Sequence, residues 1–166
     1  MRKLFIALFI LLLTGCSFLK NTPITATEDF LYNYQTLSEE VIKDLNNSID
    51  EKYNDMQKEK YKEIMKEQYK TLTYKIKDDE INGNKAKVTT TIMVKDYYKT
   101  LKEAREHKSE FENEEEYINY ELDKLASTKE KVEYTIEFNL VLTNKKWYIT
   151  DINEEITNKL NGFFEY

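Results

Sequence analysis

Few residues in this 166-residue chain have types and spacings that suggest chemistry. The one histidine, His107, lies among charged residues and is interpreted as a solvated surface side chain rather than a general base. Asp151 follows a predicted strand and is interpreted as a turn residue, with a cavity-lining role as the alternative. No serine or cysteine can be matched with a positioned histidine. We therefore predict no catalytic residue and expect that the protein is not an enzyme.

Metal and cofactor motifs are also missing from the sequence. Residues 112–116 are dense in carboxylates, yet they lack the alternating ligand positions and the turn glycine of a calcium loop. One histidine and one cysteine do not make a zinc site. The only glycines are Gly15, Gly83 and Gly162, too few and too scattered for a phosphate-cradling loop. The sequence therefore predicts no metal and no cofactor.

Cys16 is the one residue whose context predicts a specific chemical fate. Basic residues at positions 2 and 3 precede an unbroken apolar run at residues 4–13, and the tetrapeptide LTGC ends at Gly15-Cys16. This order predicts a bacterial lipoprotein signal peptide at residues 1–15, cut before Cys16 at a lipobox. The run has half of the ~20 apolar residues that a transmembrane helix needs. We expect the Cys16 thiol to carry a thioether-linked diacylglycerol, with fatty acyl chains such as palmitate.

The charge balance sets limits on what the mature chain binds. Without residues 1–15 the chain has 23 Lys and Arg against 31 Asp and Glu, a net side-chain charge of −8. This charge argues against nucleic acid and against a basic patch on anionic lipid. One acyl chain alone binds a membrane only marginally, so the two or three chains on Cys16 would provide the anchor. The expected location is the extracytoplasmic face of the cell membrane, in either a Gram-positive or a Gram-negative envelope.

Helical spacing of apolar residues predicts two long helices at the start of a single domain, residues 25–166, which follows a short tether at residues 16–24. Thr25 and Glu28 stand at capping-box spacing, and apolar residues recur at steps of three and four up to residue 45. Ser48 and Glu51 form a second box, after which the same spacing continues to residue 69.

Apolar residues alternate from residue 72 onward, which predicts a hairpin with a bulge near residues 78–80. Asn82-Gly83 is the expected loop, in a type I′ turn, which needs a positive φ at both central residues. The return strand has an expected inward set: Ala86, Val88, Thr90, Ile92 and Val94.

A charged segment at residues 97–129 has helical spacing, with a helix start capped by Asn113. A second pair of strands follows, with a turn around Asn144-Lys145, and a short helix at residues 154–160 is expected to stop at Gly162. The expected inward set of these strands is Val132, Tyr134, Ile136, Phe138, Leu140, Leu142, Trp147, Ile149 and Ile152.

The glycine-turn hairpin at residues 74–88 and the strand WYITDI at residues 147–152 resemble the nuclear transport factor two-like fold, in particular small bacterial lipoproteins of that superfamily. The resemblance spans residues 25–152. It implies an α+β domain in which N-terminal helices pack on a curved, cone-like antiparallel sheet. The charged helical insert between the two hairpins departs from the family pattern.

Aromatic residues supply the candidate binding site, because the chain has 13 Tyr, 8 Phe and 1 Trp. These side chains either fill the core or line a partly wet pocket or interface. If a pocket exists, the expected lining residues are Tyr74, Ile92, Phe138 and Trp147. The favoured function is a lipid-anchored extracytoplasmic interaction domain that contacts an envelope protein. The alternatives are a binder of a small apolar ligand in the cone cavity and, third, an isomerase-like or dehydratase-like enzyme.

Overall fold

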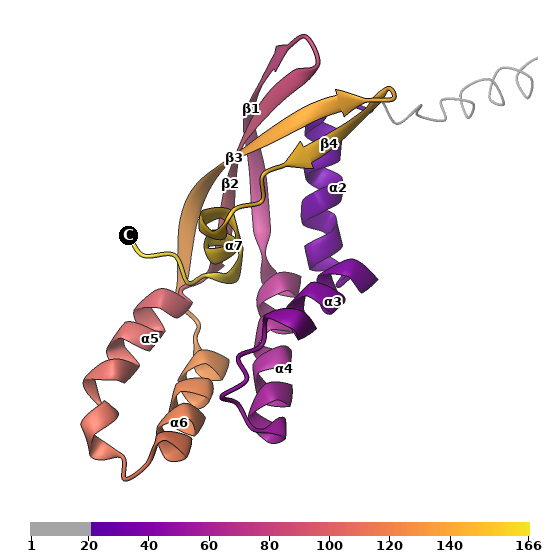
Figure 1. Cartoon of the computed structure of the whole chain (residues 1–166). Coiled ribbons are helices and arrows are strands. Elements are labelled where there is room, and N and C mark those ends of the chain that lie inside the picture. Colours follow the sequence, from indigo (N-terminus) through magenta and orange to yellow (C-terminus); the bar gives the residue numbers. More distant parts are fainter. Residues whose placement is uncertain (1–20) are drawn as a thin grey trace, which may run out of the picture.

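The structure is a computed structural model that describes residues 21–166, so the predictions for the signal peptide, Gly15 and Cys16 lie outside the described residues. The elements in chain order are α2 (Pro23–Gln35), α3 (Glu39–Ser48), α4 (Asp55–Thr71), β1 (Thr73–Asn82), β2 (Lys85–Lys95), α5 (Tyr97–Glu106), the 3-10 turn η1 (Lys108–Glu110), α6 (Glu114–Ser127), β3 (Lys131–Thr143), β4 (Lys146–Thr150) and α7 (Glu154–Asn161). The predicted α+β class is confirmed: helices pack on one four-stranded antiparallel sheet of order β1-β2-β3-β4 (Figure 1).

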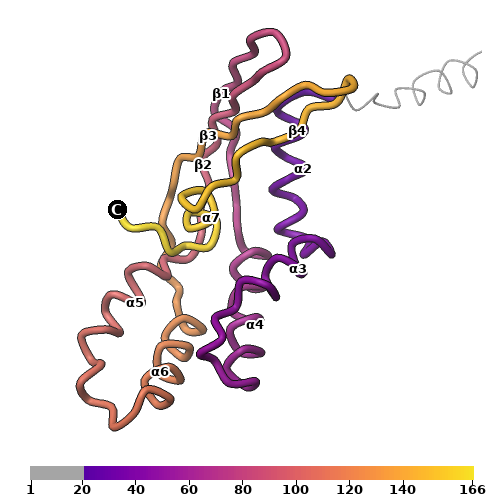
Figure 2. Tube along the Cα trace, viewed as in Figure 1, coloured from indigo at the N-terminus to yellow at the C-terminus, as the bar shows by residue number. Residues whose placement is uncertain are grey.

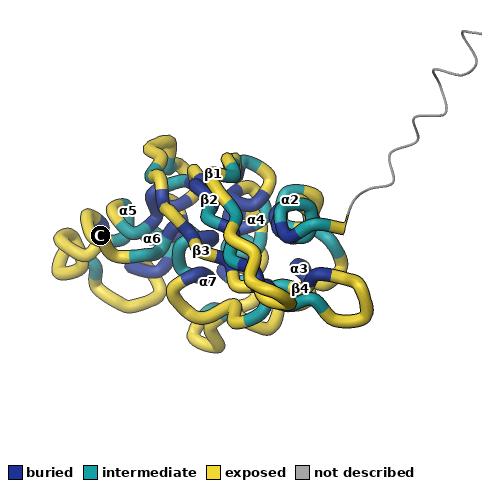
Figure 3. Tube along the Cα trace, turned by 90° about the horizontal axis from the view of Figure 1, so that it is seen from above, coloured by how far each residue is buried: buried dark blue, intermediate teal, exposed yellow. Residues whose placement is uncertain are grey.

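The sheet is built around the pairing of β2 with β3, which runs without interruption from the pair Lys85–Val141 to the pair Lys95–Lys131. Alternation turns one face of these strands inward, where α2 and α7 cover it. The sheet core consists of Leu31, Leu72, Ala86, Val88, Ile92, Val94, Tyr134, Ile136, Phe138, Leu140, Trp147, Ile156 and Leu160. Figure 3 shows buried positions inside the molecule and exposed ones at its turns. The inward sets predicted for β2 and for the middle of β3 are therefore confirmed.

The charged insert between β2 and β3 forms a helical hairpin, α5–α6, that points away from the sheet and lies beside α4 (Figure 2). Together with α3 these helices enclose a second core. This helical core consists of Val41, Leu45, Ile64, Met65, Tyr69, Tyr97, Ile118, Leu122 and Leu125. Asn113 caps α6 as predicted, since its side-chain oxygen accepts the N–H of Glu116 at 3.0 Å.

The first predicted helix begins earlier and is broken. Its N-cap is Thr22 rather than Thr25, and the two threonines form the capping box, with Pro23 in the first turn. The helix stops at Gln35 because the chain turns at Leu37, where φ is 55°. The new helix α3 then starts from its own cap at Ser38. Periodicity could not predict this break, because apolar residues stay in phase across it.

The second predicted capping box is wrong. Ser48 ends α3, and α4 starts six residues later from Asn54, whose side chain accepts the N–H of Gln57 at 3.0 Å. The Gln57 side chain in turn accepts the Asn54 N–H at 3.0 Å. This reciprocal pair satisfies two N–H groups of the first turn, as in a capping box with glutamine in place of glutamate.

The first hairpin has a bulge as predicted, but it lies between Ile76 and Asp78, just before the predicted residues 78–80, and the loop is displaced by one residue. Asn82 pairs with Lys85, so the loop is Gly83-Asn84. Only Gly83 has a positive φ there, 61°. This sign pattern is that of a type II′ turn, which takes glycine first, rather than the predicted type I′.

The second hairpin turns at Asn144-Lys145 as predicted, and here both residues have positive φ values, 51° and 64°. The type I′ sign pattern thus occurs in this hairpin. β4 ends at Thr150, and φ at Asp151 is 57°. The prediction that Ile152 points inward is wrong, because the chain leaves the sheet before it and the side chain is exposed.

Gly162 stops α7 as predicted, with a left-handed φ of 79°. At this point the sheet core and the helical core meet around Gln68 of α4, which is completely buried. Its side-chain nitrogen donates to the carbonyls of Lys95 and Asn161, and its oxygen accepts the Lys95 N–H. One amide thereby ties α4 to the end of β2 and the end of α7.

Candidate functional site in the groove between α2 and β4

A groove of about 490 Å³ runs between α2 and the edge strand β4. Apolar and aromatic side chains form its floor, and carboxylates, amides and one lysine stand at its rim. The lining residues are Asn21, Ala26, Asp29, Phe30, Asn33, Glu40, Lys146, Trp147, Tyr148, Ile149 and Ile152. Figure 1 shows α2 alongside β4, so the two elements form the two walls.

The floor of the groove follows from strand alternation and one helix residue. Trp147 and Ile149 point to the inner side of β4, where α2 covers the sheet. Phe30 of α2 meets them and packs edge-on against Phe138, with ring centroids 5.5 Å apart. The aromatic floor is therefore continuous with the sheet core.

The outer edge of β4 is partly capped by Asn21. The Asn21 side-chain nitrogen donates to the carbonyl of Lys145, and its oxygen accepts the N–H of Trp147 at 3.2 Å. The Asn21 amide thus makes the hydrogen bonds that the backbone of a neighbouring strand would otherwise make. This contact fixes the point at which the chain enters the domain.

Among residues 21–166, the rest of the β4 edge has no strand beside it. Trp147 and Ile149 oppose Leu142 and Leu140, and the Asn21 contact shows that the backbone of Trp147 faces away from β3. In an antiparallel pair the groups of every second residue face the same way, so the N–H and C=O of Ile149 face outward too. Within residues 21–166 no hydrogen bond satisfies the Trp147 carbonyl or these Ile149 groups. Unpaired strand groups therefore lie beside an apolar groove.

Of the four residues predicted to line a pocket, the structure places one in the groove and three elsewhere. Ile92 and Phe138 are fully buried inside the sheet core, and Tyr74 sits opposite Ile92 in the sheet, half-buried. Burial, followed by the nearby carboxylate of Glu28, raises the pKa of the Tyr74 hydroxyl. Of the four, Trp147 lines the groove. Phe138 lies behind the groove lining, where it packs against the ring of Phe30.

Sequence reasoning missed Phe30, Asn21 and the free edge of β4. Phe30 looks like any apolar residue of a helix, and only the docking of α2 on β4 gives it a place in the floor. The order of strands in a sheet decides which one is an edge, and the chain carries no local signal for that order.

A smaller hollow of about 280 Å³ lies in the helical part of the molecule. Its walls include Tyr53 and Tyr61, with rings 5.6 Å apart, together with Arg105, Glu121 and Phe163. Burial raises the pKa of each of these two tyrosines to about 12. Both hydroxyls therefore stay protonated at neutral pH and act as hydrogen-bonding groups rather than as bases.

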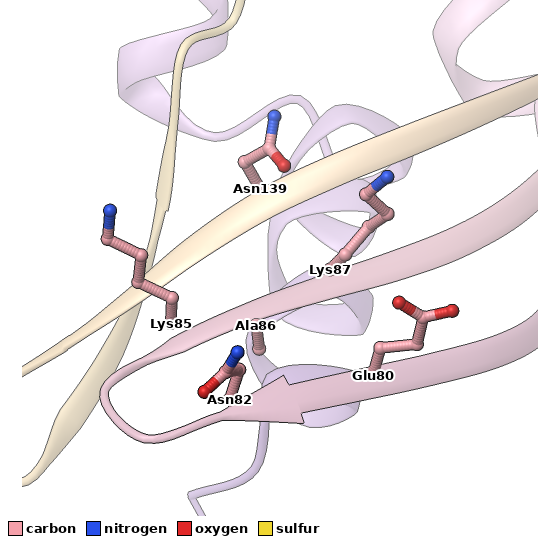
Figure 4. A pocket seen from close by; sticks show the side chains of 6 residues that line it. All are labelled: Glu80, Asn82, Lys85, Ala86, Lys87 and Asn139. Carbon is pink, nitrogen blue, oxygen red and sulfur yellow. The ribbon is translucent and has the colours of Figure 1, made fainter.

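A third hollow, of about 370 Å³, is a polar depression near the end of the first hairpin (Figure 4). It is lined by Glu80, Asn82, Lys85, Ala86, Lys87 and Asn139. Lys87 forms an ion pair of 3.1 Å with Glu137 on the neighbouring strand. Such exposed pairs contribute little to stability or affinity.

The titratable residues singled out in the sequence lie outside the groove lining. His107 is exposed as predicted, at the end of α5, and its Nδ1 lies 2.8 Å from a carboxylate oxygen of Glu110. Asp151 is exposed at the turn after β4. Within residues 21–166, no cluster of three or more His, Cys, Asp or Glu side chains could hold a metal ion. Across the same residues, no helix combines the length and apolar character needed to span a membrane.

Comparison of the chain with protein-family models, with curated proteins and with solved structures gives no match. The resemblance to the nuclear transport factor two-like superfamily therefore stays a prediction.

Proposed function

We propose that the chain is a lipid-anchored extracytoplasmic binding domain, and that the groove between α2 and β4 holds an extended segment of an envelope protein. The observation that carries this proposal is that the β4 edge, beside an aromatic floor, has no neighbouring strand within residues 21–166. Extended peptides bind such edges as an added strand, through main-chain hydrogen bonds, while pockets beside the edge select alternate side chains. The proposal keeps the predicted fold family as its fold and assigns no catalytic step.

The residues that line the groove indicate which residue types the partner segment should contain. Phe30, Trp147 and Ile149 favour apolar side chains on the face that points inward. Asp29 and Glu40 at the rim favour a lysine or arginine in the same segment. The expected partner segment is therefore an extended, apolar stretch with at least one basic residue.

The anchor supports a partner close to the membrane. Cys16 precedes Asn21 by five residues, which at ~3.5 Å per residue span at most about 18 Å. Asn21 lines the groove itself. A lipid on Cys16 would thus hold the groove within a short distance of the bilayer.

The anchor is tested by metabolic labelling with a radioactive fatty acid. The native chain is expected to be labelled and Cys16→Ser to be unlabelled, because the Cys16 thiol is the only one in the chain. Equal labelling of both chains would refute lipidation at this site.

The groove is tested by photo-crosslinking in the host cell from two adjacent positions of α2. Asn33 lines the groove, whereas Tyr32 is 59% exposed but lies outside it. A photo-reactive residue at position 33 is expected to capture one envelope protein that the same residue at position 32 does not. The same captured proteins at both positions would contradict a groove-specific partner.

Strand addition is tested by Ile149→Pro, with Ile149→Ala as its matched control. Both variants lose the Ile149 side chain, but only proline removes the outward N–H, a position where an edge strand tolerates proline. Crosslinking from position 33 is expected to survive in the alanine variant and to be lost in the proline variant. Equal loss in both variants would mean that the side chain, rather than the strand edge, binds the partner.

A small apolar ligand is the second candidate occupant, because the groove volume of about 490 Å³ falls within the range of ligand pockets. Native mass spectrometry of the protein purified from its own host distinguishes the two. A retained adduct of a few hundred daltons that is lost in Phe30→Ala would favour the ligand. A clean apo mass favours the protein segment.

A further inference from the structure

Three lysines surround the end of the sheet where both hairpins turn. They are Lys85, Lys145 and Lys146, all exposed, and none of them forms an ion pair within residues 21–166. The strand register places Lys85, Val141 and Tyr148 in one row across the outer face. Lys146 lies on the same face, with its ammonium 5.5 Å from the centre of the Tyr148 ring.

Tyr148 adds an apolar body to this cationic surface. Its side chain is 47% exposed, although aromatic rings are usually buried more deeply. Tyrosine is enriched where a protein meets the interface between lipid and water, because the ring is amphipathic. We call Lys85, Lys145, Lys146 and Tyr148 the sheet-end surface.

The point at which the chain enters the domain lies on this surface. Asn21 is bound to the carbonyl of Lys145, which belongs to the sheet-end surface, and to the N–H of the neighbouring Trp147. The five-residue connection from Cys16 reaches at most about 18 Å beyond Asn21. An acyl anchor on Cys16 therefore brings the sheet-end surface, rather than another part of the molecule, against the bilayer.

The end of the molecule opposite the sheet-end surface carries negative charges. Figure 1 shows the turn between α5 and α6 at the far end of the molecule from the turn between β3 and β4. This turn and the start of α6 carry five exposed glutamates: Glu110, Glu112, Glu114, Glu115 and Glu116. An anionic membrane would attract the sheet-end surface and repel these glutamates. Attraction at one end and repulsion at the other would both orient the long axis of the domain upright on the membrane, with the α5–α6 turn farthest from the bilayer.

We infer that the sheet-end surface binds the headgroups of anionic phospholipids and holds the anchored domain upright on the membrane. The inference rests on the proposed lipid anchor. The negative net charge predicted no basic patch on lipid, but three lysines that form no ion pair within residues 21–166 are gathered at one end, beside the anchor. Each lysine close to an anionic leaflet contributes about fivefold to membrane association at low salt. The groove then lies near the bilayer, and the α5–α6 turn points away from it.

Trp147 provides the test, because it is the only tryptophan and lies beside the sheet-end surface. The full lipidated protein is bound to phosphatidylcholine vesicles, with or without phosphatidylglycerol, that contain a lipid with a nitroxide on its headgroup. The nitroxide quenches fluorescence only at short range. Quenching of Trp147 is expected to be stronger with phosphatidylglycerol and to weaken as salt is added.

Two double variants distinguish the effect of the lysines in the sheet-end surface from the effect of net charge. Lys85→Glu with Lys146→Glu is expected to lower the quenched fraction on phosphatidylglycerol vesicles by about half or more. The control, Lys58→Glu with Lys102→Glu, makes the same change of charge on α4 and α5. Lys102 also matches Lys146 in its aromatic contact, since its ammonium lies 5.9 Å from the ring of Tyr98. The control is expected to quench as the native chain does.

Flotation of the vesicles in a density gradient distinguishes the two levels of the proposal. If the protein does not float with vesicles of either kind, the lipid anchor is refuted and the orientation with it. If it floats equally with both vesicle types, and quenching changes with neither phosphatidylglycerol nor salt, the anchor stands and the inference is overturned. Because this second outcome uses the native chain, it holds even if the double variant fails to fold.

Discussion

The sheet half and the helical half of the molecule bury apolar cores of different chemistry. The sheet half comprises β1 to β4 with α2 and α7, and its core is mostly aliphatic residues with Phe138, Trp147 and one tyrosine, Tyr134. The helical half comprises α3 to α6, and four tyrosines gather in its core and around it: Tyr53, Tyr61, Tyr69 and Tyr97. Tyr34 of α2 packs against both cores. Buried tyrosine hydroxyls donate hydrogen bonds in both halves: Tyr97 donates to the carbonyl of Ile64 at 3.3 Å, and Tyr134 donates to the carbonyl of Phe164 at 2.9 Å. The sheet half depends on apolar packing alone to a greater degree.

The two halves are joined by polar side chains that are themselves buried. Asp96, the residue after β2, caps α5 by accepting the N–H of Lys99 and also accepts the hydroxyl of Tyr166. The C-terminal segment then sends Phe163 into the helical half, against Tyr97, and Phe164 into the sheet half, against Tyr134. Consecutive residues of one short segment therefore pack on different cores, which should couple the two halves.

The largest expected effects come from truncating one core at a time. Phe138→Ala in the sheet half is expected to lower the free energy of unfolding by about 4 kcal/mol, and Leu122→Ala in the helical half by about 3 kcal/mol. Both side chains are completely buried. Unfolding in urea is measured by Trp147 fluorescence, which reports on the sheet half, and by far-ultraviolet ellipticity, which reports mainly on helices.

Coupled halves require the two probes to give one transition, in the native chain and in both variants. If Leu122→Ala lowers the ellipticity midpoint and leaves the fluorescence midpoint unchanged, the two halves unfold separately and are independent domains.

The next effect is expected at the junction itself. A Cβ on Gly162 would lie within 2.5 Å of the side-chain nitrogen of Gln68 and still closer to the carbonyl oxygen of Lys95, and φ there is 79°. Gly162→Ala is therefore expected to cost about 3 kcal/mol, from the clash and the left-handed backbone together.

Gly83→Ala is the matched control for this junction. Its φ is also positive, at 61°, but a Cβ there has nothing within 4 Å. The control is expected to cost about 1 kcal/mol. Equal losses in urea unfolding for the two alanine variants would show that the close contacts at Gly162 relax without cost, and that the junction is loose.

Strand content and facing were predictable from sequence because period-two alternation is a local property. The inward residues of β2 follow directly from it. The stop at Gly162 was predictable for another local reason, since glycine readily adopts the left-handed backbone that ends a helix. The break at Leu37 was not predictable, since it depends on a left-handed backbone at a leucine, a residue type that rarely adopts one. The loop at Gly83-Asn84 differs from the prediction because glycine suits either central position, depending on the turn type.

The candidate site was predictable only in part, because a groove needs two elements distant in the chain. Trp147 was singled out from its strand, whereas Phe30 enters through the packing of α2. Ile92 and Phe138 were singled out as inward-facing, and the structure shows that inward here means the core. Alternation gives the face of a strand on which a side chain lies, but not whether that face meets a pocket or another layer.

Alkaline pH is expected to weaken the molecule mainly through the helical half. Burial is the first cause that raises the pKa of Tyr53 and Tyr61 in the helical half, and of Tyr34 where α2 meets both cores, from 10.0 to about 12. In the unfolded chain these hydroxyls ionise near pH 10, so the folded state loses stability as pH rises from 10 to 12 and keeps it in full below 10. Tyrosinate absorbance and ellipticity are measured together across this range.

The ellipticity should fall as the buried tyrosines ionise, with Trp147 fluorescence following if the halves are coupled. Tyrosines that all ionise near pH 10 without loss of ellipticity would contradict the burial of these hydroxyls.

The smallest effect is a gain of stability in the sheet half alone. Lys145 has a φ of 64°, in a type I′ turn whose second central position favours glycine. Lys145→Gly is expected to raise the free energy of unfolding by about 0.5–1 kcal/mol, because it relieves the left-handed backbone at a non-glycine residue. Lys146→Gly makes the same chemical change one residue later, in the extended backbone of β4, and is expected to cost about 0.5–1 kcal/mol. Urea unfolding followed by Trp147 fluorescence measures both, and a loss in both variants would mean that the Lys145 side chain contributes more to the turn than its backbone costs.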